Sequence, residues 1–381
     1  MASAPSHWPQ TIRQIVLGAI VALATLVAMT LLPHSRYVRW QATRNEAFAR
    51  LGWIYERIHY DPTPIDVAFV GTSHTLNSID GALVERAIAQ AGGRMPDGRC
   101  VTVSNLAMPM YGRNMHWAIV RELLGARRPA LLVIDLYENE SRKSNAYFAA
   151  IADPADLVSA PLLVNPSYFS DLARLPWRQF QLAVESVAPG AFGLKDHFSL
   201  ADYDGSTVDN TYSIRVDGRE LTPPRTRPAS AGELDAHVAE RLANRDLSVL
   251  GPRLARYEYA SPLRYYGGLL DLARAKGVPV LRAYLPTYGQ GSQPDLALNL
   301  GKDVPMFAAP DIMAPRSAWY DADHLGRGAA EAYSQRIGQA LAARFKPAAG
   351  ATVVPTTGCN FGVPERRLVH PFVWPRDRHA G

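Results

Sequence analysis

The sequence has little cysteine, and the two residues it has are far apart. Cys100 and Cys359 are the only cysteines in 381 residues, and neither belongs to a CxxC pair or to a Cys/His cluster. This spacing argues against a zinc site, and we expect no bound metal. Two interpretations of the cysteines remain open. They form a disulfide if the domain lies outside the cytoplasm, or Cys100, which opens an apolar run, is a buried thiol.

The sequence also lacks any concentration of charge of one sign. The formal net charge is +5, but the positive residues are mostly arginines spread along the chain, and no nucleic-acid-binding motif accompanies them. There is no glycine-rich phosphate loop and no repeat of the solenoid kind. We therefore expect no nucleic-acid partner and no metal or organic cofactor. A composition with 48% hydrophobic and 20% charged residues excludes global disorder.

One long hydrophobic run stands near the amino terminus. Residues 15–32 carry no charge, and their number suits a helix that crosses a hydrocarbon core of about 30 Å. Pro33 ends the run, and no small-x-small cleavage site precedes a polar start. We expect residues 1–33 to form a short cytoplasmic stub and an uncleaved signal anchor, in a single-pass protein of the inner (cytoplasmic) membrane.

The flanks of this run give conflicting indications of orientation. More arginines follow it than precede it, so the positive-inside rule taken alone places the body of the protein in the cytoplasm. Large domains can translocate despite flanking charge, and the chemistry inferred below has its usual substrates outside the cytoplasm. We therefore predict a periplasmic or otherwise extracytoplasmic body.

The body shows alternating strand-like and helix-like segments. Residues 34–60 have apolar side chains at helical intervals, which predicts a juxtamembrane helix that packs on the domain or lies along the lipid surface. The β-α-β-α-β order of the segments that follow predicts an α/β fold with a doubly wound parallel sheet, whose ligands gather at the carboxyl ends of the strands. Strands are expected at 65–70, 100–106 and 130–136, and helices at 78–90 and 114–124.

The alternation stops after residue 140 and later resumes. Residues 141 to about 255 are expected to form a large insertion that covers the site, with one helix at 231–247. The resumed pattern predicts a helix at 261–275, a strand at 278–286 and a last helix at 326–345. The domain thus spans residues 61–346. Residues 347–381 lack periodicity and are expected to form a flexible tail.

A candidate nucleophile follows the first predicted strand. In Gly71-Thr72-Ser73-His74, a turn after a buried strand exposes the serine hydroxyl at the carboxyl edge of the sheet, where turn N–H groups can hold an anion. His74 is either a pocket residue or polar surface. The alternative for the whole turn is a simple Thr/Ser helix cap.

A candidate base and its carboxylate precede the last predicted helix. A serine hydroxyl needs a base to remove its proton, and the imidazole needs a carboxylate to fix its tautomer. Asp321 and His324, three residues apart on one turn, can place these groups side by side. The alternative is that Asp321 or Asp323 caps the helix and that His324 is a surface histidine.

Together these two segments resemble the SGNH hydrolase superfamily, over residues 65–140 and 260–345. Its first block puts the serine after the first strand, here GTSH where GDS is commoner, and its last block is DxxH, here DADH. The resemblance implies a flavodoxin-like three-layer fold with a Ser73, His324 and Asp321 triad. Middle blocks of that family supply oxyanion donors. By position these are Gly112, or Ala107 in its place, and Asn139, which act beside the Ser73 N–H, although the third block lacks the usual GxND form. Asn105 is a candidate pocket residue.

The GTSH variant, the single membrane helix and the long insertion resemble the membrane-tethered branch of that superfamily, which assists alginate acetylation and teichoic-acid D-alanylation. The resemblance implies an O-acyltransferase or esterase that forms an acyl-serine ester. Its partners would be an acyl donor, a polysaccharide or cell-envelope glycan acceptor, and a membrane-bound O-acyltransferase. Two alternatives are a soluble-type lipase or esterase, and a degenerate domain that binds glycan or scaffolds an envelope acylation or export complex.

Overall fold

Five parallel strands form the centre of the fold, in the order β2-β1-β3-β6-β7. In chain order this is 2-1-3-4-5, the order of flavodoxin-like doubly wound sheets. The strands are β1 (Val67–Val70), β2 (Val103–Asn105), β3 (Leu131–Leu136), β6 (Val280–Tyr284) and β7 (Met306–Phe307). The computed structural model describes residues 10–43, 47–136, 142, 144–216, 219–220, 224–243, 250–291, 294 and 301–361.

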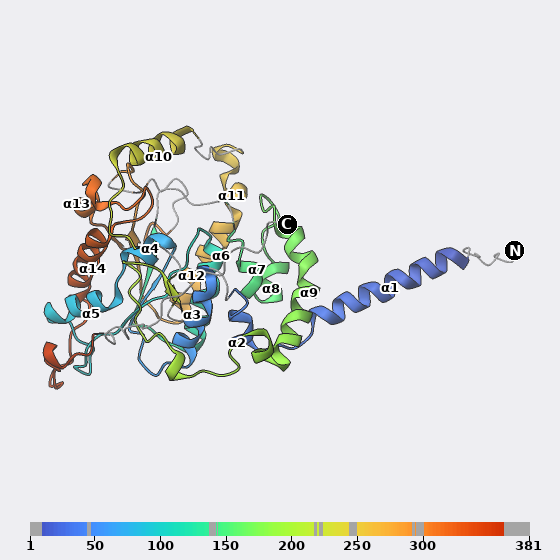
Figure 1. The fold of residues 1–381 in the computed structure, drawn as a ribbon, viewed down its shortest axis with the longest axis horizontal. Coiled ribbons are helices and arrows are strands. Elements are labelled where there is room, and N and C mark those ends of the chain that lie inside the picture. Colours follow the sequence, from blue (N-terminus) through green and yellow to red (C-terminus); the bar gives the residue numbers. More distant parts are fainter. Residues whose placement is uncertain are drawn as a thin grey trace, which may run out of the picture.

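Helices cover both faces of the sheet because every strand buries both of its faces. Along β1, Val67 and Phe69 belong to one apolar core, whereas Ala68 and Val70 belong to the other. The first core is covered by α5 (Gly81–Gln90), α13 (Pro310–Met313) and α14 (Arg327–Ala342), and the second by α3 (Arg50–His59), α6 (Arg113–Ala126) and α12 (Ala260–Ala275). Figure 1 shows α5 and α14 on one side of the sheet and α3, α6 and α12 on the other.

The predicted α/β class and parallel sheet are confirmed, while several boundaries differ. The helix expected at 78–90 is α5, which begins at Gly81 because the Asp80 side chain caps it, and the segment expected as the serine turn continues into a separate short helix, α4 (Ser73–Ser78). The strand expected from Cys100 begins at Val103. The short strand β7 had no sequence signal, since it lies outside the longer apolar runs.

Residues 34–60 pack on the domain rather than standing apart from it. They contain α2 (Arg36–Trp40), a 3₁₀ turn (Ala47–Ala49) and α3, with residues 44–46 outside the described part. Trp40, Leu51 and Ile54 are buried in the core shared with α6 and α12. The buried Arg50 guanidinium donates to the carbonyl oxygens of Asn105 and Ala107. Of the two predicted locations, the structure shows packing on the domain.

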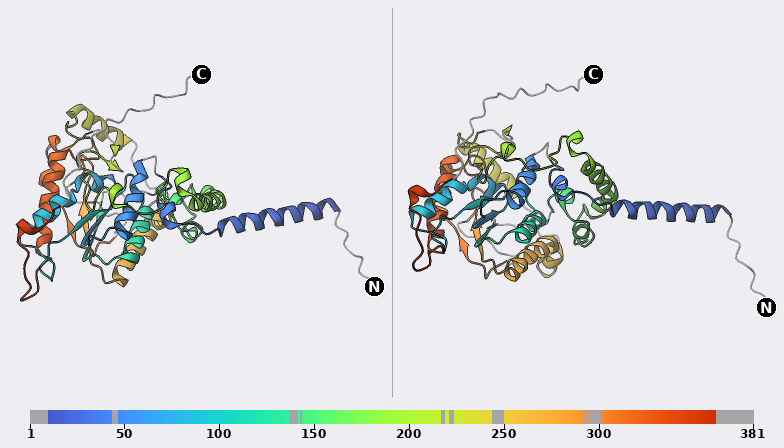
Figure 2. Two further views of the ribbon diagram at one scale, coloured as in Figure 1. Left: turned by 60° about the horizontal axis from the view of Figure 1, so that its bottom comes forward. Right: turned by 90° about the horizontal axis from the view of Figure 1, so that it is seen from below.

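Helix α1 (Gln10–Thr30) extends away from the rest of the protein (Figures 1 and 2). Within it, Ile12–Thr30 has a mean hydropathy of 2.1 and none of it is buried. This is a helix long and apolar enough to cross a membrane, as the sequence predicted. After Thr30 the chain turns at Leu31, and residues 32–35, which include Pro33, lead into α2.

The insertion divides into two parts on different sides of the domain. Helices α7 (Phe148–Ile151), α8 (Pro154–Val158) and α9 (Tyr168–Val187) lie beside the base of α1, whereas α10 (Ala231–Ala243) lies over the edge near α4 and α13 (Figure 1). Arg241 on α10 donates to Thr287 Oγ1 and to the Tyr288 carbonyl, 2.9 Å in both cases. Smaller elements of the described insertion are β4 (Arg215–Val216), β5 (Arg219–Glu220), α11 (Ala255–Glu258) and three 3₁₀ turns (Pro189–Phe192, Leu200–Asp202 and Pro252–Leu254).

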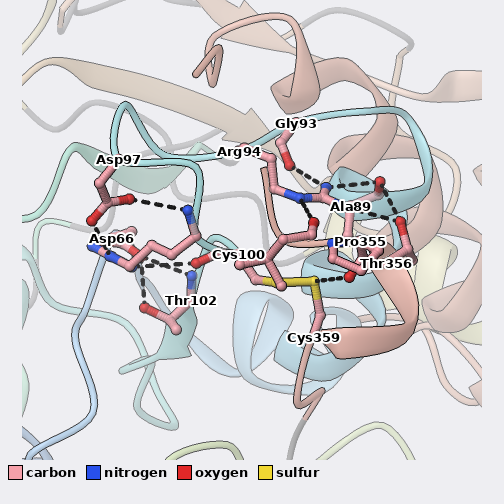
Figure 3. Close-up of a disulfide and its surroundings, with 12 residues drawn as sticks. Asp66, Ala89, Gly93, Arg94, Asp97, Cys100, Thr102, Pro355, Thr356 and Cys359 are labelled. Carbon is pink, nitrogen blue, oxygen red and sulfur yellow. Dashed lines mark hydrogen bonds and ion pairs between the residues drawn. A yellow bond between two sulfur atoms is a disulfide. The ribbon is translucent and has the colours of Figure 1, made fainter. Parts of the chain in front are cut away.

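The two cysteines form a disulfide, which Figure 3 shows beside the start of β2. Cys100 is bonded to Cys359, with 5.8 Å between their Cα atoms. The Arg94 side chain donates to the Val354 carbonyl at 2.8 Å and to Thr356 Oγ1 at 3.0 Å. The prediction of a flexible tail is therefore wrong for residues 347–361, because a distant cysteine gave no local signal for its attachment. Residues 362–381 lie outside the described part.

The buried side chain of Glu85, on α5, provides a test of the packing of α5 against β2, because it makes the stability of the protein depend on pH. Its buried carboxylate accepts from the Val103 N–H at 2.7 Å, and burial raises its pKa from 4.5 to about 8. Between about pH 4.5 and pH 8, folding therefore takes up a proton. The free energy of unfolding falls as the pH rises through this range. Glu85→Gln keeps the acceptor without the charge.

We expect the stability of Glu85→Gln, measured by chemical denaturation of the full chain in detergent, to rise relative to wild type by about 1 kcal/mol per pH unit between about pH 5 and 8. Glu331→Gln, which changes an exposed partner of Arg327, is the control and should run parallel to wild type. If the stability of Glu85→Gln instead changed with pH in parallel with that of wild type, the assignment of a buried, protonated carboxyl to Glu85 would be contradicted.

Candidate active site

The turn that carries Ser73 is held in one conformation from beneath. Gly71 ends β1, and a Cβ at this position would lie 2.7 Å from the Asp135 carboxyl, so only glycine fits. Thr72 is the N-cap of α4, and its hydroxyl accepts from the His74 N–H at 3.3 Å. Ser73 is the first residue of the helix and is partly exposed. The predicted helix cap is thus present, but at Thr72, which leaves the Ser73 hydroxyl out of the capping role.

A buried ion pair under this turn was not recognised in the sequence as part of the site. Asp135, at the end of β3, accepts from the Thr72 N–H at 2.6 Å and pairs with Arg113 at 2.9 Å. Burial alone would raise the pKa of Asp135, but His116, Arg113 and the Thr72 hydrogen bonds outweigh it and hold the pKa below its usual value. Burial lowers the pKa of His116 to about 4, so this imidazole is neutral at pH 7. An acidic residue inside the apolar run LLVIDL was the available signal.

Asp321 and His324 lie in a tight loop before α14. Trp319 and Leu325 pair across the loop and are both buried in the core. The Trp319 indole N–H donates to the Met313 carbonyl at 2.9 Å. The loop is fixed from outside as well, because the Tyr288 N–H donates to the Ala322 carbonyl at 2.7 Å. The side chains of Asp321 and His324 are therefore held on a rigid loop.

Within this loop the carboxylate and the imidazole are hydrogen-bonded. His324 Nδ1 lies 2.9 Å from both carboxylate oxygens of Asp321, and Asp321 Oδ1 also accepts from the N–H groups of Asp323 and His324 at 2.8 Å. Burial would raise the pKa of Asp321, but these hydrogen bonds hold it below its usual value. Nδ1 therefore carries the proton. Nε2 is buried, with no hydrogen-bond partner among the described residues.

The two halves of the site meet through His74. Its ring lies 5.8 Å from that of His324 and edge-on to it. His74 is 2% exposed, which excludes the surface role, and its Nδ1–H donates to the Leu285 carbonyl at 2.9 Å. Burial, followed by the charge of His324, lowers the pKa of His74, so it is neutral and its Nε2 is an acceptor, 3.4 Å from the Tyr111 hydroxyl. The Ser73 turn and the Asp321–His324 pair are thus at the same sheet edge, without a hydrogen bond from Ser73 to His324 Nε2.

Asn105 supports the site from behind instead of lining a pocket. Its amide nitrogen donates to the carbonyl oxygens of Thr75, Leu76 and Ile79 at 2.9 to 3.3 Å, and so satisfies the carboxyl end of α4. Its side-chain oxygen accepts from the Ala107 N–H at 3.1 Å. This engages the Ala107 amide that was a candidate oxyanion donor.

The remaining oxyanion candidates, Gly112 and Asn139, stay predictions. The loop after β2 touches the nucleophile turn through Met108, whose N–H donates to the Gly71 carbonyl at 2.9 Å. Gly112 starts α6 with a φ of 137°, and a Cβ there would lie 2.5 Å from the Asn145 nitrogen, so its lack of a side chain is required by the backbone. Asn139 lies outside the described residues.

Arg225, from the insertion, is a second residue that the sequence did not indicate. It is 4% exposed, and its N–H donates to the Tyr212 carbonyl at 2.8 Å. Burial lowers its pKa to about 10, and Asp321 is the largest of the opposing charges. The guanidinium remains charged at pH 7, and the charge of Asp321, the carboxylate that orients His324, favours that charged form. Nothing in the local sequence distinguishes it from the other dispersed arginines.

A cavity of about 370 Å³ lies away from this site. It is lined by residues that include Thr63, Arg99, Val354 and the disulfide cysteines, and by none of the three triad candidates. In the part of the chain that the structure describes, no group of three or more His, Cys, Asp and Glu side chains is placed to hold a metal ion. The side chains of Ser73, His324 and Asp321 are of the kinds that carry out nucleophilic attack and proton transfer.

These features define the class of site: a serine at the start of a helix that follows a buried strand, with an oriented imidazole at the same edge of a parallel sheet. Comparison with known proteins adds nothing to this description, since no protein-family model, no curated protein and no solved structure matches the chain.

Proposed function

We propose that this chain is a membrane-anchored O-acyltransferase or esterase of the SGNH type, with Ser73 as nucleophile, His324 as base and Asp321 as the carboxylate that orients it. One observation carries the proposal. His324 is hydrogen-bonded through Nδ1 to Asp321, while its buried Nε2 is unpartnered among the described residues at the edge where Ser73 begins α4. An oriented imidazole with an open nitrogen beside a serine is the arrangement that nucleophilic catalysis requires.

In the first half of the reaction, Ser73 Oγ attacks the carbonyl carbon of an acyl ester donor and passes its proton to His324 Nε2. The negative charge that develops on the carbonyl oxygen is stabilised by the Ser73 N–H, with Asn139 and Gly112 as the predicted further donors. The C–O bond to the leaving group then breaks. His324 returns the proton to the leaving alcohol, and an acyl-serine ester remains.

In the second half, a sugar hydroxyl or water takes the place of the departed alcohol. His324 Nε2 removes its proton as the oxygen attacks the acyl-serine carbonyl, and the proton then goes to Ser73 Oγ as that ester bond breaks. Asp321 stays ionised throughout, because the same hydrogen bonds that hold its pKa low also stabilise the protonated imidazole. The charge of Asp321 in turn favours the charged form of the buried Arg225.

The proposed location is the periplasmic or other extracytoplasmic face of the inner membrane. Helix α1 supports single-pass anchoring, and the Cys100–Cys359 disulfide supports an oxidising compartment, against the positive-inside count. An envelope or exported polysaccharide is then the proposed acceptor, and a membrane-bound O-acyltransferase that delivers the acyl group is the proposed partner.

A second candidate is a scaffold that binds glycan or holds an acylation complex together without catalysis. It is favoured by one observation, that Ser73 and His324 Nε2 are not hydrogen-bonded. The missing Ser73–His324 hydrogen bond does not exclude catalysis, because catalytic hydrogen bonds are often long before substrate binds and tighten only in the complex. The two candidates differ in what they require of Ser73.

The test measures ester-linked acyl groups on the exported glycan of cells that lack the chain and are complemented with wild type, Ser73→Ala or Ser78→Ala. Ser78→Ala is the matched control, since it removes a hydroxyl from the other end of α4. The acyltransferase requires that Ser73→Ala match the deletion while Ser78→Ala restores acylation. Acylation that survives Ser73→Ala but is lost on deletion would establish the scaffold instead.

A further inference from the structure

Helix α9 carries an apolar surface that the body of the protein does not cover. Its inner face is buried through residues such as Leu175 and Leu182. A second set of apolar side chains recurs on the outer side at spacings of three or four residues, so that they form a single stripe along the helix. This stripe consists of Phe169, Ala173, Trp177, Phe180, Val184 and Val187, all of them exposed.

The exposure of this stripe is unusually large for a set of big apolar side chains. The exposed fractions are 71% for Phe169, 63% for Trp177 and 86% for Val187. Leu162 and Leu163, in the segment that leads into α9, are also more than half exposed. Single exposed hydrophobic residues are ordinary, but a continuous stripe over a helix of 20 residues marks an interaction surface.

The location of α9 indicates what this surface contacts. The Gln179 side chain donates to the carbonyl of Thr30, the last residue of α1, at 3.3 Å. Five residues later, the Ser35 N–H donates to Ser186 Oγ at 2.8 Å. Helix α9 is therefore bonded to both sides of the point where the candidate membrane span ends.

The direction of α9 is that of a helix on a membrane surface. Figures 1 and 2 show α9 lying across the base of α1 rather than continuing along it. If α1 crosses the bilayer, a helix transverse to its end lies in the plane of the interface, where amphipathic helices bury their apolar face. Trp177 on the stripe is a residue type that the interface favours, and Arg174, exposed one turn before it, is placed to meet anionic headgroups.

We propose that the α9 stripe is inserted into the interfacial layer of the bilayer that α1 crosses, with lipid as its occupant. The domain is then attached at two places, by a spanning helix and by a surface helix. Two attachments fix the tilt and rotation of the domain, so that the Ser73 edge of the sheet keeps a constant orientation relative to the membrane. This inference rests on α1 as the span and stands independently of the acyl-transfer chemistry.

Single spin labels on the full-length protein provide the test. The described cysteines are both in the disulfide, so an introduced cysteine can be labelled alone. Trp177→Cys and Val184→Cys place a label on the stripe, and Phe169→Cys is a third position in case one variant fails to fold. Leu242→Cys on α10, where the native side chain is 65% exposed, is the matched control. Each protein is reconstituted in vesicles of phosphatidylcholine and phosphatidylglycerol, and collision rates with oxygen and with a water-soluble nickel chelate are measured.

For lipid contact, the ratio of oxygen to nickel collisions should be at least about threefold higher on the stripe than at the control position, and it should not change when the protein is diluted in lipid. Equal oxygen-to-nickel ratios on the stripe and at the control position would overturn the proposal. The stripe would then face water in these vesicles, and its partner would be a membrane protein that they lack. A high ratio that falls on dilution, with spin–spin broadening before dilution, would also overturn it by assigning the stripe to a second copy of the chain.

Discussion

A fluorophosphonate probe should label the full-length protein at Ser73, and the label should be lost in Ser73→Ala and in His324→Ala. The probe is attacked by an activated serine oxygen and loses fluoride, so it reports the nucleophile and its base without knowledge of the acyl donor. Because the members of a triad act as a unit, removal of either residue should lower the labelling rate by more than about 10⁴-fold. Labelled protein is measured by in-gel fluorescence as a function of time.

Ser78→Ala and His237→Ala serve as controls for this experiment, one at the far end of α4 and the other on α10. Both should be labelled at the wild-type rate. Labelling that persists in Ser73→Ala would assign the nucleophile to another serine. Wild-type protein that is unreactive in detergent and becomes reactive only beside a membrane-bound acyltransferase would show that the partner completes the site.

Asp135→Ala should destabilise the protein by about 3–5 kcal/mol, the cost of leaving a buried charge without its partner. In buried positions, Arg113 would lose its carboxylate partner and the Thr72 N–H would lose its acceptor. The turn that presents Ser73 rests on that hydrogen bond, so labelling should fall as well. Stability is measured by chemical denaturation of the full chain in detergent.

The sign of the pH dependence separates this ion pair from ordinary packing. Since the pKa of Asp135 is held below its usual value, its contribution to stability is present at neutral pH and is lost only as the pH falls below about 4, and the difference from wild type should narrow there. Asp311→Ala removes an exposed partner of Arg336 and should cost no more than about 1 kcal/mol. A loss as small as this in Asp135→Ala would contradict the role assigned to the pair.

The sequence was informative wherever the signal was local. Four apolar runs were long enough to be predicted as strands, and the helices predicted between them required a parallel sheet, which is why the fold class was predictable. The same holds for the Asp321–His324 pair, since a spacing of three residues on a turn constrains both side chains. Ser73 as the residue after a strand followed from the same sheet geometry.

What the sequence missed depends on contacts between distant residues. Asp135 and Arg113 are 22 residues apart and on different elements, so their pairing under Thr72 had no local pattern. Arg225 comes from an insertion without periodicity, and only the fold brings it under the electrostatic influence of Asp321. The attachment of residues 347–361 required a disulfide partner 259 residues away.

That disulfide closes most of the chain into a covalent ring. The bond joins residues that are 259 apart in sequence, so the whole insertion and the loop with Asp321 and His324 lie inside the ring, while α1 and Ser73 lie on the arm that precedes it. A protease that cuts once anywhere within the ring therefore opens it without dividing the molecule. Both pieces of such a nicked protein, the one with Ser73 and the one with His324, would stay covalently joined to the same N-terminal helix α1 until a reductant reached the sulfur atoms.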